Sequence, residues 1–110
     1  MTPPTCIAFY GLRFDISLDE IEALELRTDR RIVAARKNGL QFYWGRFSAP
    51  DERYLLVVGG RIGIMGPENQ LAIAVSDFEF EAIKSTTKAT LLAAQLEGEC
   101  SLHILWEIDE

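Results

Sequence analysis

Two capping boxes, Ser17-Leu18-Asp19-Glu20 and Ser76-Asp77-Phe78-Glu79, determine where helices begin in this chain. In this motif the serine hydroxyl bonds the amide three residues on, and the glutamate reaches back to the serine amide. A β-rich stretch precedes each box, residues 6–16 before the first and residues 71–75 before the second. The chain is therefore predicted to alternate between strands and helices.

The remaining patterns complete a single domain over residues 1–110. The predicted helices cover residues 18–26, burying Leu18, Ile21 and Leu24, then residues from Thr28 or Asp29 to 37, and residues 77–96. The predicted strands are residues 6–16 (one bulged strand or two short ones), 40–47, 53–58, 61–65 (an extension or a separate strand), 71–75 and 102–108. This order predicts an α+β fold, with a mostly antiparallel sheet of four to six strands and helices packed on one face. The ferredoxin-like split βαβ with an added strand is the nearest common architecture by element order alone, and it implies no function.

Charge is unevenly distributed along the chain. The formal net charge is −6, yet residues 1–76 hold nine acidic and nine basic side chains, so the excess lies in residues 77–110. Direct nucleic-acid binding is disfavoured, because phosphate contacts need a net basic face. We predict a protein partner with a basic surface instead, the alternative being an acidic surface that serves only solubility.

An aromatic cluster at residues 42–47 holds four of the eleven aromatic side chains. On a strand, Phe42 and Trp44 share one face, while Tyr43 and Phe47 share the other. One face then belongs to the core, and the other presents Tyr43 and Phe47, with Arg46 nearby, to solvent, a helix or a partner. A strand covered on both faces is the alternative interpretation.

Catalytic residue patterns are lacking in the sequence. The single histidine, His103, lies three positions after Cys100, where side chains on a strand point to opposite faces. Neither C-x-x-C nor H-E-x-x-H spacing occurs, and the glycines of residues 59–66 match no phosphate-binding pattern. We therefore predict no catalytic site, no metal site and no cofactor.

Targeting signals are lacking as well. The longest apolar stretch, residues 54–65, falls short of the roughly 20 residues of a spanning helix, and no secretory signal begins the sequence. These observations predict a cytoplasmic protein without membrane attachment, in which Cys6 and Cys100 stay reduced. If the first and last strands pair antiparallel, the two thiols lie too far apart for a disulfide.

Two functional hypotheses follow. The first is a small acidic binding or inhibitor protein, without catalysis of its own, that neutralises or masks a partner protein as immunity proteins and phage-encoded inhibitors do. Its candidate partner-binding residues are Tyr43, Phe47, Arg46, Glu79, Glu81, Glu97 and Glu99. The alternative is a small-ligand-binding or enzymatic α+β domain acting as a homodimer, its pocket lined by Tyr10, Arg13, Trp44, Arg61 and His103. A pocket with convergent polar groups favours the alternative, whereas a filled core and a flat or convex acidic face favour the first.

Overall fold

The computed structural model describes residues 5–48 and 53–107, apart from the side chains of residues 46–48, 53 and 107. The elements in this part of the chain are β1 (Thr5–Ile16), the 3-10 turn η1 (Leu18–Glu20), α1 (Ile21–Glu25), α2 (Arg30–Lys37), β2 (Gln41–Ser48), β3 (Arg53–Met65), α3 (Asp77–Ala93) and β4 (Ser101–Glu107). With η1, α1 and α2 taken as one helical connection, the order is that of a split βαβ, without the added strand that the sequence predicted.

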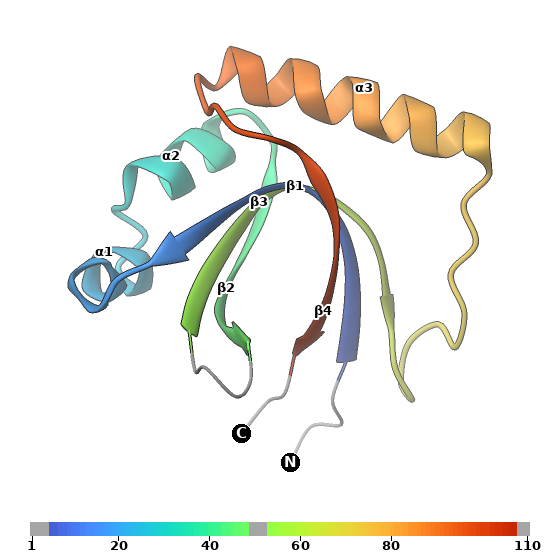
Figure 1. Ribbon diagram of the computed structural model, residues 1–110, viewed down its shortest axis with the longest axis horizontal. Helices are drawn as coiled ribbons and strands as arrows, with labels where there is room; N and C mark the ends of the chain where they lie inside the picture. The colour runs from blue at the N-terminus through green and yellow to red at the C-terminus, as the bar shows by residue number, and fades with distance from the viewer. Residues whose placement is uncertain (1–4, 49–52, 108–110) are drawn as a thin grey trace.

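The strands form one antiparallel sheet in the order β2-β3-β1-β4. Figure 1 shows this sheet bent into an arch, with α3 lying across its top and α1 and α2 beside one side. The helices thus lie on the outer, convex face. The predicted α+β class, with an antiparallel sheet and helices on one face, is confirmed.

Two glycines allow the central strands to approach each other closely within the arch. Gly11 of β1 lies opposite Gly59 of β3, and both are buried. A Cβ atom built on either one would lie 2.8 Å from the Cα atom of the other, so a side chain has no room there. We call the two sides of the arch the β2 leg (β2, residues 12–16 and 53–58) and the β4 leg (β4, residues 5–10 and 60–65).

Strand alternation divides the apolar interior into an outer core, under the helices, and an inner core, between the legs. Leu55 to Val58 of β3 are four consecutive buried residues, as expected for a strand covered on both faces. The outer core contains Leu12, Ile16, Leu56 and Val58 of the sheet, packed with Leu24, Ile32, Ala35, Leu91 and Leu96 of the helical regions. The inner core contains Ile7, Phe9, Val57 and Leu105, with Tyr43 and Ile64 packed against them.

The strand predicted at residues 71–75 does not form. These residues lack regular secondary structure, and the bridge before them joins Met65 to Gln70. The Ile73 side chain lies over Gly63, with its Cδ1 atom 2.8 Å from where a Cβ of Gly63 would be. The segment therefore packs by its side chains against β3 instead of pairing with a strand edge.

The first predicted helix also differs from expectation. It divides into η1 and α1, and Leu18, which the sequence placed in the core, is 79 % exposed because the outer core is filled by Leu24 and Ile21 of the following turn. The Ser17 hydroxyl donates to Glu20 Oε1 at 3.0 Å, and Glu20 also accepts from the Ser17 amide. The predicted capping box between Ser17 and Glu20 is therefore present at this helix start.

The other helix signals hold. Asp29 caps α2 through its bond to the Arg31 amide at 2.8 Å, and Gly39 adopts a φ of 73° after the helix. Ser76 is the N-cap of α3, and its hydroxyl accepts a hydrogen bond from the Glu79 amide at 3.1 Å. The helix ends at Ala93, a few residues before the predicted end. The predicted turn at residues 49–52 lies outside the described residues.

The two cysteines are free and far apart along the β1–β4 ladder. Cys6 lies opposite Trp106, whereas Cys100 precedes the other end of β4. Among the described residues, no helix has the length and apolarity needed to cross a membrane.

Candidate functional site

The aromatic strand β2 contributes to both cores. Phe42 and Trp44 pack against the outer core. Tyr43 packs edge-on against Phe9, with ring centroids 5.7 Å apart, and its hydroxyl lies 3.2 Å from an Arg61 guanidinium nitrogen that donates to it. The strand is therefore covered on both faces around Tyr43, which is half-buried. The side chains of Arg46 and Phe47, the other candidates on this strand, lie outside the described part of the structure.

The four candidate acids form two groups instead of one patch. Glu79 and Glu81 lie in the first turns of α3, whereas Glu97 and Glu99 follow its C-terminal end, and all four are exposed. From Glu81 to its last residue, Ala93, α3 rises about 18 Å, so the two groups lie near opposite ends of the helix. Glu81 is paired with Lys84 at 2.6 Å.

The five residues of the predicted ligand pocket lie on two different faces. Tyr10 packs under α3, edge-on to Phe80, and Trp44 packs against the outer core. His103 and Arg61 are the two cross-strand partners of Phe9 and lie on the inner face with it. Arg13 is paired with Val57 and lies on the same inner face. The His103 Nε2 atom donates to the Gly11 carbonyl at 3.2 Å. The structure therefore does not bring these five side chains together.

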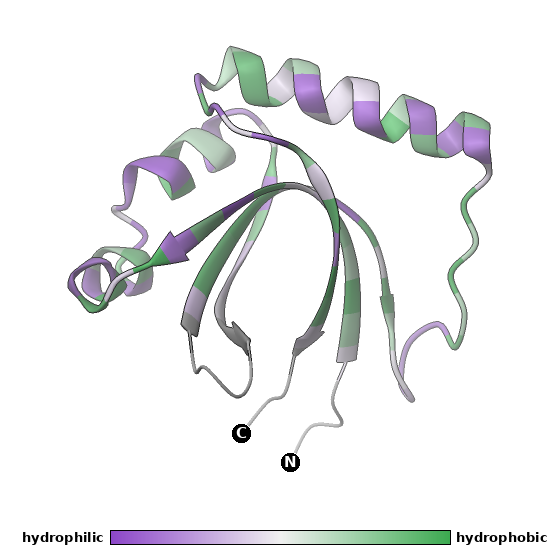
Figure 2. Ribbon diagram, viewed as in Figure 1, coloured by the Kyte–Doolittle hydropathy of each residue, from purple (hydrophilic) through white to green (hydrophobic). Residues whose placement is uncertain are grey.

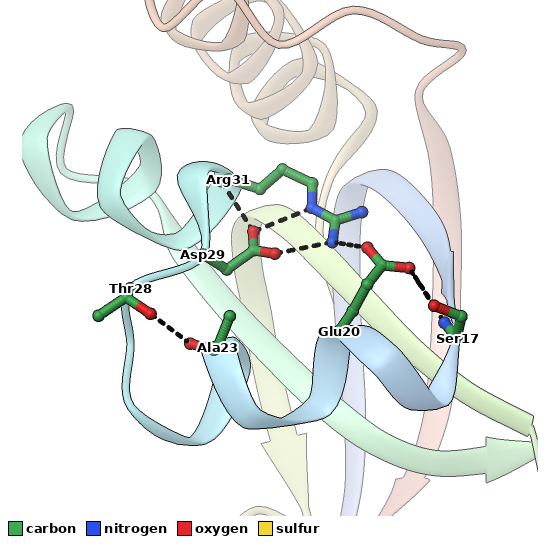
Figure 3. A network of polar contacts seen from close by, with 6 residues as sticks. All are labelled: Ser17, Glu20, Ala23, Thr28, Asp29 and Arg31. Atoms are coloured by element: carbon green, nitrogen blue, oxygen red, sulfur yellow. Dashed lines mark hydrogen bonds and ion pairs between the residues drawn. The ribbon is translucent and has the colours of Figure 1, made fainter.

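A polar network that sequence reasoning missed joins the first helical turns to α2 (Figure 3). The Arg31 guanidinium contacts Asp29 at 2.9 Å and Glu20 at 2.5 Å, and it lies 5.1 Å from the centroid of the Phe14 ring. The hydrogen bonds from Arg31 lower the pKa of the Asp29 carboxyl, and the Ser17 amide and Arg31 lower the pKa of the Glu20 carboxyl. Arg31 is thus bound by two carboxylates, and the network holds the first helical turns against α2.

This network predicts a pH dependence of stability. The two carboxyls have lowered pKa values in the folded state, so their contribution is complete above the unfolded pKa values, near 4, and is lost as pH falls through the folded values. We expect Arg31→Met to lose about 2 kcal/mol of unfolding free energy at pH 7, and the gap to wild type to close on acidification. Urea titrations at several pH values measure this gap. Arg13→Met, which breaks the exposed pair with Asp15, is the control with little effect, and a gap for Arg31→Met that stays constant with pH would contradict the assignment.

An apolar groove lies on the outer face of the β4 leg. Its volume is about 300 Å³, and apolar side chains make up nearly all of its wall. The groove is lined by three strands (β1, β3 and β4), by α3 and by the coil that precedes α3. The lining residues are Cys6, Ala8, Ile62, Met65, Ile73, Val75, Phe80, Leu102 and Ile104. We call this feature the β4 groove. Figure 2 shows the apolar segment before α3 running beside this leg.

The β4 groove continues into an exposed row of large side chains on β4. Leu102, Ile104 and Trp106 alternate along the strand and are 51 %, 63 % and 55 % exposed. Isolated exposed apolar residues are ordinary, but a contiguous patch on a soluble domain marks an interaction surface. The sequence signal was present in the alternation of residues 102, 104 and 106. Alternation alone cannot tell which face of a strand the rest of the chain covers.

Exposed carboxylates lie near one end of the β4 groove, where Phe80 of α3 lines it. Asp77 and Glu79, both exposed, lie in the turn of α3 that carries Phe80. Within residues 5–48 and 53–107, no three metal-ligating side chains gather into a site. The groove thus combines an apolar floor with carboxylates at one end.

Comparison with known proteins finds no matching family model, no matching curated protein and no matching solved structure. The chemistry of the β4 groove itself therefore carries the functional argument.

Proposed function

We propose that this chain is a small acidic binding protein that neutralises or masks a partner protein carrying a basic surface. The observation that supports this proposal most is the β4 groove, an apolar surface left uncovered beside exposed carboxylates. The partner we propose presents a short apolar segment flanked by lysine or arginine. The apolar side chains would be buried in the groove, and the basic ones would approach Asp77 and Glu79, which speeds encounter by electrostatic attraction.

The alternative function, a ligand-binding or enzymatic homodimer, finds support in the groove volume, which is near the lower limit for small-molecule sites. The polar groups proposed for that function lie elsewhere, on two faces of the sheet. A site with few polar groups does little to orient a small substrate. The groove therefore favours a protein segment as its occupant.

A set of four synthetic peptides tests this proposal. Two carry the same leucines flanked by lysine, one with helical spacing and one with alternating spacing, and two matched peptides carry glutamate in place of lysine. In a Trp44→Phe variant the fluorescence reports on Trp106 alone, since the chain has two tryptophans. We expect at least one lysine peptide to shift this fluorescence saturably, neither glutamate peptide to do so, and added salt to weaken the binding.

Matched variants locate the binding. Leu102→Ser should weaken it by about tenfold or more, because a buried leucine contributes roughly 1.5–3 kcal/mol. Leu92→Ser removes a leucine that is 75 % exposed on α3 and lies outside the groove, and it should bind as wild type does. Calorimetry on the unmodified chain provides an independent reading. If neither lysine peptide binds, or if Leu102→Ser has no effect, the proposal is wrong.

A further inference from the structure

We infer that the partner covers the β4 leg with an amphipathic helix lying across Leu102 and Ile104, and not with an added β-strand. This inference rests on the proposed function and specifies the form of the segment that binds. It follows from which face of the leg is uncovered, from the dimensions of that face and from its walls.

The first argument is the difference between the two legs. On the β2 leg, α1 and α2 cover the outer face with Leu24, Ile32 and Ala35, all buried. On the β4 leg, the described part of the chain places only the first turns of α3 and the coil before it at the outer face, as Figure 1 shows. The side chains of Leu102 and Ile104 are therefore left exposed where their counterparts on the other leg lie under helices.

The second argument concerns what each kind of segment would bury. A strand added at the outer edge of β4 would pair with its backbone and extend the sheet, but side chains stand perpendicular to the sheet. Leu102, Ile104 and Trp106 would remain exposed after such an addition. A segment that lies on the face buries all three. The uncovered surface is thus a face, and a strand at the edge leaves it uncovered.

The third argument is size. A helix with its side chains is about 10 Å wide. Two neighbouring strands, such as β1 and β4, together span about the same width. The row from residue 102 to residue 106 extends over about 13 Å, the length of about two and a half helical turns. Phe80 of α3 and Ile73 of the coil form the wall along one side of this surface. A short helix with one apolar stripe fits this surface.

The charges on α3 at one end of the groove indicate which charge the partner helix carries there. Lys84 lies 4.8 Å from the centroid of the Phe80 ring, and Glu81 pairs with that lysine at 2.6 Å. The charge of Lys84 at the Phe80 ring is thus offset by Glu81, and Asp77 and Glu79 add negative charge in the same turns. The helix that binds therefore carries lysine or arginine toward this end.

The two lysine peptides described above decide between the two forms. We expect the peptide with helical spacing to bind at least about tenfold more tightly than the peptide with alternating spacing, and to gain helical circular dichroism on binding. A second helical peptide that differs only by a proline at one central position should lose binding, because proline breaks the helix. Sedimentation of the unmodified chain should give a monomer, because the occupant is a partner segment.

Each other result overturns a different statement. If the alternating peptide binds more tightly, the partner adds a strand, and the helix inference fails while the proposed function stands. If neither peptide binds, both fail. If the chain sediments as a dimer that Leu102→Ser converts to a monomer, a second copy occupies the groove, and the helix inference is wrong.

Discussion

Gly11→Ala is expected to destabilise the protein by about 4 kcal/mol or more, which for a domain of this size approaches complete unfolding. The added Cβ atom would overlap the Val58 carbonyl oxygen and lie 2.8 Å from the Gly59 Cα atom. Both neighbours are backbone atoms of the paired strand, so no side chain can rotate to make room. The strands must separate where the two legs of the arch meet, and both cores are disturbed together.

Gly39→Ala is the matched control for this substitution. No atom lies within 4 Å of a Cβ built at Gly39, and the only cost there is its φ of 73°. That cost is about 1–2 kcal/mol for a residue with a side chain. Urea unfolding measures both variants against wild type. Equal losses at the two positions would mean that the close approach of Gly11 and Gly59 is not needed for the fold.

Phe9→Ala is expected to cost 3–5 kcal/mol, roughly the range for truncating a buried phenylalanine. Phe9 is fully buried in the inner core, and its ring packs edge-on against Tyr43 of the opposite leg. The substitution removes this ring contact between the legs and leaves a cavity that neighbouring strands cannot fill, because cross-strand hydrogen bonds hold them.

Phe78→Ala provides the control with the same chemical change. Phe78 is 84 % exposed on α3, so its removal should alter the unfolding free energy by less than about 0.5 kcal/mol. Chemical denaturation followed by circular dichroism compares the two variants. A small loss for Phe9→Ala would show that the space between the legs is loosely packed and that the inner core contributes little to stability.

The aromatic cluster shows how far the sequence could go toward the site. Alternation correctly placed Phe42 and Trp44 on one face and Tyr43 on the other, because the side-chain period of a strand is two. What covers each face depends on residues far away in the chain. Tyr43 meets Phe9, which lies 34 positions earlier, only because the arch brings the legs together.

The sequence by itself determined the features that depend on a few neighbouring residues. The cap at Ser76, the left-handed turn at Gly39 and the strand periods required no knowledge of the rest of the chain, and with the element order they led to the α+β class. For the cap of α2 the sequence left Thr28 and Asp29 open, and the structure shows Asp29. Only the tertiary structure decided that residues 71–75 stay without a strand partner, that Leu18 is exposed, and that Arg31 joins Glu20 to Asp29. It also decided that Leu102, Ile104 and Trp106 stay uncovered on β4. The physical reason is that burial and ion pairing arise between segments distant in sequence. The close approach of Gly11 and Gly59, a steric fit between two backbones 48 positions apart, is one such contact that no local pattern encodes.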